Sequence, residues 1–252
     1  MAAKINQYGG VAEAQNALAR EISIIIDQSS NAPLLLLLSG GSCLTILPLI
    51  QEYLERIPPK KYQLTIGMVD ERFDTEESNF VHLKKDYGKF YDFMTKRDAV
   101  FIDTSPKLKD QYEMAEWYEK ELYRHPDKRR DLSIVIILGM GPDGHIAGIM
   151  PYPDAEQETF YETFLDTDKL VVGYDATGKN KFTKRFTLTY PALLRANSLF
   201  AYIVGDEKKA ALHQALKENP PLHRCPVYYF QTTKQDVSLY TNLALGSDDK
   251  KS

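Results

Sequence analysis

The sequence predicts an α/β protein built on a doubly wound, mostly parallel sheet with helices on both faces. Two observations lead to this prediction. Short and continuously apolar segments recur along the chain, and continuous apolarity is typical of strands that are buried on both faces. Segments with apolar residues at helical spacing lie between several of these strands, which is the order expected of βαβ units.

The first half of the chain contains four predicted strands and three predicted helices. The strands are Leu34 to Leu38, Leu64 to Val69, Ala99 to Ile102 and Ser133 to Leu138. Residues 11 to 28 and Leu44 to Ile57 have the apolar spacing of amphipathic helices. Pro48 is expected to weaken or delay the first turn of the second helix. A charged helix is predicted over residues 107 to 123.

The second half continues the alternation. Strands are predicted at Leu170 to Tyr174, Phe186 to Thr189, Leu199 to Val204 and Val227 to Gln231, with a helix from about 207 to 217. A chain of 252 residues is long enough for one large α/β domain. Residues 1 to 245 are therefore interpreted as a single domain, and the polar residues 246 to 252 as a flexible tail.

Composition favours a soluble globular protein and argues against several classes of partner. The 31 Lys and Arg residues against 35 Asp and Glu give a net charge of -4, which offers no general attraction to nucleic acid or anionic lipid. The leucine run Leu34 to Leu38 is far shorter than the roughly 20 apolar residues that cross a bilayer. An anionic small molecule would need a local cationic pocket.

Targeting signals and cysteine content indicate a cytoplasmic protein. The N-terminus has no apolar leader segment, and the two cysteines, Cys43 and Cys225, are too few for a disulfide framework. The reducing cytoplasm is the expected location. The oligomeric state is left open, and a monomer is compatible with the sequence.

Three predicted strands end in polar or glycine-rich segments. LLLLL runs into SGGS, LTIGMV into DER, and SIVIIL into GMGPDGH. Ligands of doubly wound sheets bind beyond the carboxyl ends of the strands. These three segments are therefore expected to converge on one pocket.

The SGGS segment has two interpretations. Glycines between a strand and a helix let backbone N–H groups approach an anion, which suits a phosphate. The alternative is a tight turn with Ser42 as a helix N-cap. Asp70-Glu71-Arg72 likewise fits either a surface ion-pair cluster or a ligand-contacting segment, and its place at a strand end favours the ligand.

The segment GMGPDGH satisfies the GxGxxG pattern of dinucleotide-binding proteins. That pattern needs a long helix at its third glycine, but Pro151 follows Gly144 too closely, and Asp143 would repel a pyrophosphate. A better interpretation is a rigid loop that presents His145. Histidine accepts protons near neutral pH, and a nearby carboxylate fixes its tautomer.

A metal site is not predicted. The other histidines, His82, His125, His213 and His223, show no HxH or HExxH spacing, and neither cysteine has a close partner.

The motifs together resemble the 6-phosphogluconolactonases. They are SGGS, VDER followed by Ser78-Asn79, GMGPDGH, RFTLTYP and GDEKKAAL, and they span about residues 34 to 216. The resemblance implies a Rossmann-like fold of the glucosamine-6-phosphate deaminase type. It also implies hydrolysis of 6-phosphogluconolactone to 6-phosphogluconate, the second step of the oxidative pentose phosphate pathway, without metal or cofactor. The implied partner is then a phosphosugar lactone.

The resemblance also implies roles for individual residues. His145 would be the general base that activates water and later returns the proton to the ring oxygen. Asp143 would orient His145, and Arg72 would stabilise developing negative charge. The other matched positions belong to the substrate site: Gly40, Gly41, Ser42, Arg185 and Lys208 for the phosphate, and Asp70 near the sugar.

The related glucosamine-6-phosphate deaminases are the main alternative. Their loop typically carries a glutamate five residues after the histidine, where this chain has Met150, and an aromatic residue where it has Arg72. Both differences favour the lactonase, although the pair Ile146-Ala147 resembles the deaminase. The chain departs from the usual SGGSTP at Cys43-Leu44 and from the usual TASLFPG after the histidine.

Two further alternatives belong to other classes. Related folds also serve as phosphosugar sensors in transcription regulators, but this chain has neither room for a DNA-binding module nor a basic patch. The nicotinamide enzymes remain as the alternative suggested by the glycine pattern.

Overall fold

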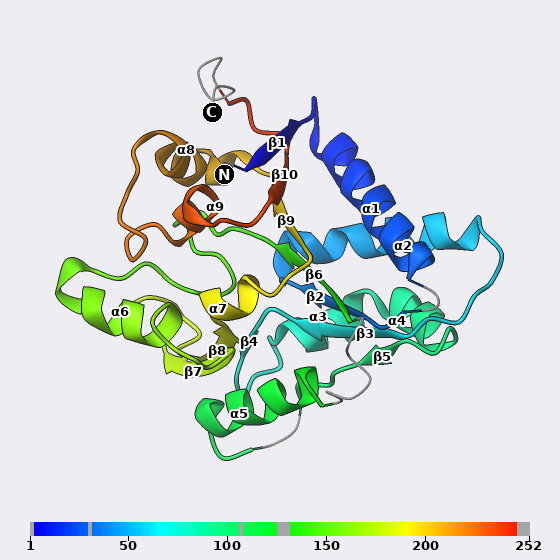
Figure 1. Cartoon of the computed structure of the whole chain (residues 1–252), viewed down its shortest axis with the longest axis horizontal. Coiled ribbons are helices and arrows are strands. Elements are labelled where there is room, and N and C mark those ends of the chain that lie inside the picture. The colour runs from blue at the N-terminus through cyan, green and yellow to red at the C-terminus, as the bar shows by residue number, and fades with distance from the viewer. Residues whose placement is uncertain (1–2, 30–31, 106–107, 125–131, 246–252) are drawn as a thin grey trace.

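The computed structural model describes residues 3–29, 32–105, 108–124 and 132–245 of the chain. Within this part, a seven-stranded sheet forms the centre of the molecule, in the order β1-β10-β9-β6-β2-β3-β5 (Figure 1). All of its neighbouring strands are parallel. The strands are β1 (Lys4–Gln7), β2 (Leu34–Leu38), β3 (Leu64–Met68), β5 (Val100–Phe101), β6 (Ser133–Leu138), β9 (Ser198–Ile203) and β10 (Val237–Thr241).

Helices cover both faces of this sheet, as predicted. The α-helices are α1 (Val11–Gln28), α2 (Leu47–Glu55), α3 (Asn79–Asp86), α4 (Gly88–Thr95), α5 (Gln111–Leu122), α6 (Gln157–Phe164), α7 (Tyr190–Leu193), α8 (Lys209–Lys217) and α9 (Tyr229–Thr232). The described part of the chain also contains the short 3-10 helices η1 (Gly41–Ile46), η3 (Asp154–Glu156), η4 (Asp206–Lys208) and η5 (Pro226–Tyr228). The predicted doubly wound α/β fold is confirmed.

The leucine run of β2 explains why the sheet needs two covering layers. Leu34, Leu36 and Leu38 pack into a core with α1, α2 and α4. Leu35 and Leu37 point the other way, into a core that includes α5 and α6. Successive side chains of a strand point to opposite faces, so a continuous apolar run supplies both cores. In Figure 1, α1 and α2 lie on one side of the central sheet and α5 and α6 on the other.

Pro48 has the predicted effect on the helix after β2. The chain leaves the strand through the 3-10 helix η1, and α2 begins only at Leu47, with Pro48 in its first turn. A proline is tolerated there because first-turn N–H groups have no partner within the helix.

Two predicted strands lie in a different sheet from the one expected. β7 (Val171–Asp175) and β8 (Lys184–Leu188) form an antiparallel sheet with β4 (Asp70–Arg72), in the order β4-β8-β7. The link from β7 to β8 spans only residues 176–183. A parallel pair needs a crossover of a dozen or more residues, so this short link produces a hairpin.

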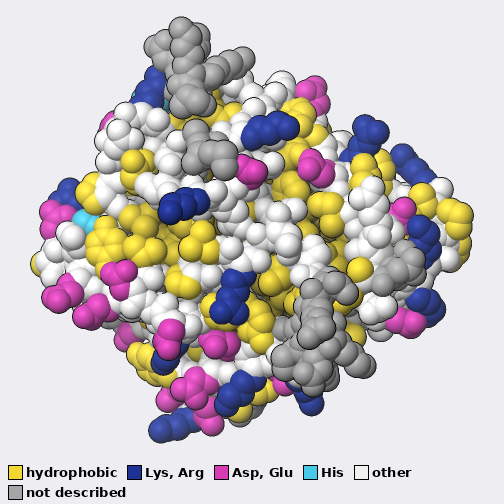
Figure 2. All heavy atoms as spheres, viewed as in Figure 1, with side chains coloured by type: hydrophobic (Ala, Val, Ile, Leu, Met, Phe, Trp, Pro, Cys, Tyr) yellow, Lys and Arg dark blue, Asp and Glu magenta, His cyan; other side chains and the backbone are white. Residues whose placement is uncertain are grey.

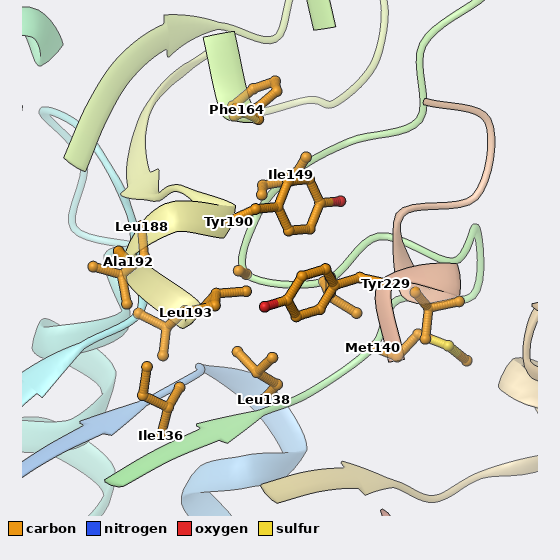
Figure 3. Packing of buried hydrophobic residues seen from close by; sticks show 14 of the residues in the cluster. Ile136, Leu138, Met140, Ile149, Phe164, Leu188, Tyr190, Ala192, Leu193 and Tyr229 are labelled. Carbon is orange, nitrogen blue, oxygen red and sulfur yellow. The ribbon is translucent and has the colours of Figure 1, made fainter. Parts of the chain in front are cut away.

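The predicted strand at Val227 to Gln231 is wrong. Residues 226–232 form η5 and α9, and the last strand of the sheet is β10. Pro226 starts the helical turn, and a short apolar run cannot be assigned to strand or helix by periodicity alone. The ring of Tyr229 stacks on Tyr190 with 4.8 Å between centroids, above Leu138 and below Ile149 in the view of Figure 3.

Strand order locates the ligand crevice. From β2 the chain moves outward through β3 and β5 on one side, and later through β6, β9 and β10 on the other. The sheet therefore has its topological switch point between β2 and β6, where doubly wound proteins bind ligands at the carboxyl ends of the strands.

None of the described helices is both long and apolar enough to cross a membrane. On the face shown in Figure 2, cationic and anionic side chains are interspersed. That face presents no large field of one sign to a polyanion.

The predicted tail at residues 246 to 252 lies outside the described residues, as does the first residue of the helix predicted over 107 to 123.

Candidate active site

A pocket lies at the switch point, beyond the carboxyl ends of β2 and β6. The pocket has a volume of about 180 Å³. Every predicted site residue lines it except Asp143, which lies beside His145. The lining residues are Ser39, Gly40, Gly41, Ser42, Asp70, Arg72, Asn79, Gly139, Met140, His145, Ala147, Gly148, Arg185 and Lys208.

The SGGS segment forms one wall of the pocket. Gly41 has a positive φ of 61°, a backbone conformation that favours glycine. A Cβ added to Gly40 would lie 2.0 Å from Oδ1 of Asn79, so a larger residue there would displace the Asn79 side chain. The Lys208 ammonium donates to Ser42 Oγ over 3.2 Å. Backbone N–H groups and a cation at one wall can hold an anion such as phosphate.

The short strand β4 brings Asp70 and Arg72 to the pocket. In the register with β8, Asp70 lies opposite Thr187 and Arg72 opposite Arg185. Side chains of one strand alternate in direction, so Asp70, Arg72 and Arg185 share the face that lines the pocket.

Arg185 and Asp70 form a buried ion pair at the base of the pocket. Arg185 Nη2 donates to Asp70 Oδ2 over 2.6 Å, and both side chains are buried. Burial alone would lower the pKa of Arg185, but the charge and hydrogen bond of Asp70, together with Tyr174 and Glu71, raise it overall. Arg185 Nε has no hydrogen-bond partner among the described residues. Asp70 therefore holds the Arg185 guanidinium in place at the wall of the pocket.

Glu71 points away from the pocket and anchors the segment behind it. Its carboxyl oxygens accept hydrogen bonds from the backbone N–H groups of Asn79 and Phe80, each over 2.7 Å, and from the Thr104 hydroxyl over 2.8 Å. Burial raises the pKa of Glu71 to about 7, although these three donors act to lower it. Glu71 thus ties β4 to the start of α3, where Asn79 supports Gly40.

His145 and Asp143 form a hydrogen-bonded pair at the rim of the pocket. His145 Nδ1 lies 2.6 Å from Asp143 Oδ1, which also accepts the His145 backbone N–H over 3.2 Å. Burial acts to raise the pKa of Asp143, but its hydrogen bonds and charge interaction with His145 lower it overall. Because the carboxylate engages Nδ1, the Nε2 lone pair is available to accept a proton.

The glycines of GMGPDGH shape the loop that carries this pair. Gly141 donates to the His145 carbonyl over 2.9 Å, and Gly144 donates to the Gly141 carbonyl over 3.0 Å. Gly144 has a positive φ of 83°. The third glycine therefore makes a tight turn rather than opening a long helix.

Four residues that support the site were not predicted as site residues. Thr187 donates to the carbonyl of Ala147, and Tyr174 donates to the carbonyl of Gly148. Gly148 itself has a positive φ of 65° and packs on Asp70. Asn79 donates through Nδ2 to the Asp70 carbonyl over 2.8 Å. The sequence signals for these contacts were the pair Ser78-Asn79 and Gly148, the first glycine after His145.

The family model described as glucosamine-6-phosphate isomerases/6-phosphogluconolactonase matches residues 10–239. This chain belongs to that family. A 6-phosphogluconolactonase of Thermotoga maritima is 29% identical over 203 residues, covering 79% of this chain and 80% of the relative. One of Bos taurus is 30% identical over 195 residues, covering 73% and 70%.

Solved structures of the family share the fold. The crystal structure of a 6-phosphogluconolactonase from Shewanella baltica aligns with a TM-score of 0.75 at 22% identity, covering 95% of this chain and 97% of that one. A 6-phosphogluconolactonase from Thermotoga maritima aligns with a TM-score of 0.62 at 25% identity, covering 95% and 98%.

The glucosamine-6-phosphate isomerase/6-phosphogluconolactonase family contains two chemistries, and Met150 bears on which one applies. Met150 is fully buried, and its sulfur lies 3.6 Å from Asn180 Nδ2. It does not line the pocket. This chain therefore has a buried thioether five residues after His145, where a deaminase is expected to carry a carboxylate.

Proposed function

We propose that this protein hydrolyses 6-phospho-D-glucono-1,5-lactone to 6-phospho-D-gluconate, as in the oxidative pentose phosphate pathway. The observation that carries the proposal is the His145–Asp143 pair, which lies at one pocket with the SGGS wall and Lys208. A base at one side and an anion-binding wall at the other suit a substrate with a reactive carbonyl and a phosphate.

The mechanism follows from the available nitrogen of His145. Nε2 accepts a proton from water while the water oxygen attacks the lactone carbonyl carbon. Asp143 stabilises the imidazolium that forms, and Arg72 stabilises the negative charge on the carbonyl oxygen. When the tetrahedral intermediate collapses, the bond from carbon to ring oxygen breaks and the imidazolium returns its proton to that oxygen.

We assign each part of the substrate to a wall of the pocket. We place the phosphate against Gly40, Gly41, Ser42 and Lys208, with Arg185 adding positive charge from the base of the pocket. Asp70 then lies toward the sugar, beside Gly148. No step requires a metal ion or cofactor. Among the described residues, no cluster of three or more His, Cys, Asp and Glu side chains could hold a metal.

A paired assay tests this proposal. We expect purified protein to accelerate lactone hydrolysis above a buffer blank, which is essential because the lactone also hydrolyses spontaneously. Ammonia release from glucosamine 6-phosphate should stay at background, because Met150 cannot transfer protons. No acceleration above the blank would refute the lactonase assignment, and ammonia release would replace it with deamination.

Lys208 provides a test of the phosphate wall. Replacing it with glutamine removes a buried cation, and losing one charge-assisted contact should raise KM for the phosphorylated lactone about 10- to 100-fold. Hydrolysis of unphosphorylated gluconolactone should change little. Steady-state kinetics with both substrates would measure the difference.

Lys209 offers a matched control for that variant. It is the next residue along the chain but is exposed, so Lys209→Gln should leave both substrates unaffected. Equal changes in KM for the two lactones in Lys208→Gln would argue against a phosphate at this wall.

We also propose that the protein acts in the cytoplasm. Both cysteines are buried and free, and burial raises the pKa of the Cys43 thiol to about 12. Unpaired thiols suit a reducing compartment. Cell fractionation followed by the lactonase assay would test this, since activity confined to a secreted fraction would contradict it.

A further inference from the structure

The loop between β7 and β8, residues 176–183, lies outside the family motifs and contacts the pocket residue Arg72. Its ends are joined by a hydrogen bond from Ala176 N to Thr183 O over 2.6 Å. Within it, Asn180 Oδ1 accepts the backbone N–H of Phe182 over 3.0 Å. Lys179 forms an ion pair of 2.7 Å with Glu156, in the segment that follows the His145 loop. The loop is therefore held by its own hydrogen bonds and by a contact on the His145 side.

Phe182 of this loop packs against Arg72. The guanidinium carbon of Arg72 lies 4.4 Å from the centre of the Phe182 ring, within the distance of a cation–π contact. The strand register explains the contact, because Arg72 pairs with Arg185 and Phe73 N then donates to the Lys184 carbonyl over 2.9 Å. The two segments of the chain thus stay adjacent after β4 ends and before β8 begins, which is where Phe182 lies.

Burial and a neighbouring arginine disfavour the charge of Arg72, although the carboxylates of Asp70, Glu71 and Glu77 favour it. Arg185 lies opposite Arg72 in the register, and burial together with the charge of Arg185 lowers the pKa of Arg72. Arg72 Nη1 donates to the Glu77 carbonyl over 2.7 Å, which fixes one end of the guanidinium. Nε is buried without a hydrogen-bond partner among the described residues. The Phe182 ring, with its centre 4.4 Å from the guanidinium carbon, is a second contact of the group.

We infer that Phe182 is a positioning residue, whose ring holds the Arg72 guanidinium at the wall of the active-site pocket. This inference rests on the proposed lactonase activity for its kinetic readout. The ring supplies negative electrostatic potential to a cation that a nearby arginine repels. Phe182 acts only through Arg72, since Arg72 lines the pocket and Phe182 does not.

Four variants test this by a double-mutant cycle. Phe182→Leu keeps the apolar bulk but removes the ring, and we expect kcat/KM for the lactone to fall about tenfold, the scale of a partly desolvated cation–π contact. Phe182→Tyr keeps the ring and should retain activity. Once Arg72→Ala has removed the cation, adding Phe182→Leu should lower kcat/KM less than about twofold further. An equal tenfold loss in both backgrounds would overturn the inference.

Lys181 supplies the control on the same loop. Its ammonium also lies over the Phe182 ring, at 4.6 Å from the centre, but the residue is exposed. Lys181→Gln should leave kcat/KM unchanged. A tenfold loss in this variant would mean that the Phe182 ring affects activity through Lys181 rather than through Arg72. That result would also overturn the inference.

A crystal structure of Phe182→Leu separates this inference from the proposed function. We expect the Arg72 guanidinium to leave its present place in that variant while the backbones of β4 and β8 stay superposable. An unmoved guanidinium would refute the positioning role even if the protein hydrolyses the lactone. A displaced guanidinium would support the role even if the true substrate were another phosphosugar.

Discussion

We expect the His145→Ala variant to hydrolyse the lactone with a kcat lowered about 100-fold or more, the scale of a lost general base. His145 is the histidine at the pocket, and Asp143 engages its Nδ1 over 2.6 Å. Without the imidazole, water must attack unassisted. Product binding should persist because the SGGS wall and Lys208 are unchanged. Stopped assays corrected for spontaneous hydrolysis would measure kcat, and calorimetry would measure affinity for 6-phosphogluconate.

Two companion variants show whether His145 acts as the base. His213→Ala removes an exposed histidine of α8 and should retain full activity. Asp143→Asn keeps a hydrogen-bond acceptor but loses the charge that stabilises the imidazolium, so its kcat should fall between the wild type and His145→Ala. If His145→Ala kept more than about a tenth of the wild-type kcat, another group would have to be the base.

Much of the site was predictable because its chemistry follows buried strands. The parallel sheet forces the ends of β2, β3 and β6 to one edge, so SGGS, DER and GMGPDGH converge without any knowledge of loop geometry. His145 and Asp143 are close in sequence, and their pairing is a local event. The family and the fold class were therefore predicted correctly from the strand pattern and the motifs.

The supporting contacts were not predictable because they join distant residues through side chains. Thr187 reaches Ala147 from 40 positions away, and Arg185 reaches Asp70 from 115. These pairs depend on the antiparallel sheet of β4, β8 and β7. β4 has only 3 residues, too few to show the alternation that predicts a strand. The importance of Phe182 likewise emerges only when β8 is placed beside β4.

The second large effect is expected from the Gly141→Ala substitution. A Cβ at this position would lie 2.1 Å from His145 Cε1, 2.2 Å from its Nδ1 and 2.6 Å from Asp143 Oδ1. Because these distances are far below van der Waals contact, the two side chains must shift, which disturbs the hydrogen bond between His145 and Asp143. Misplacing a catalytic group by about 1 Å can cost 100-fold, so we expect kcat to fall by about that factor.

Gly88→Ala is the matched control, since a Cβ there would have no heavy atom within 4 Å. It should leave kcat unchanged. Thermal unfolding of both variants would show whether the Gly141→Ala chain remains folded, as we expect for a loop at the rim of the pocket. A folded Gly141→Ala protein with wild-type kcat would mean that the His145–Asp143 hydrogen bond is dispensable. In that case the glycine of the motif would serve the turn alone, and the orientation of the imidazole would have to come from the substrate.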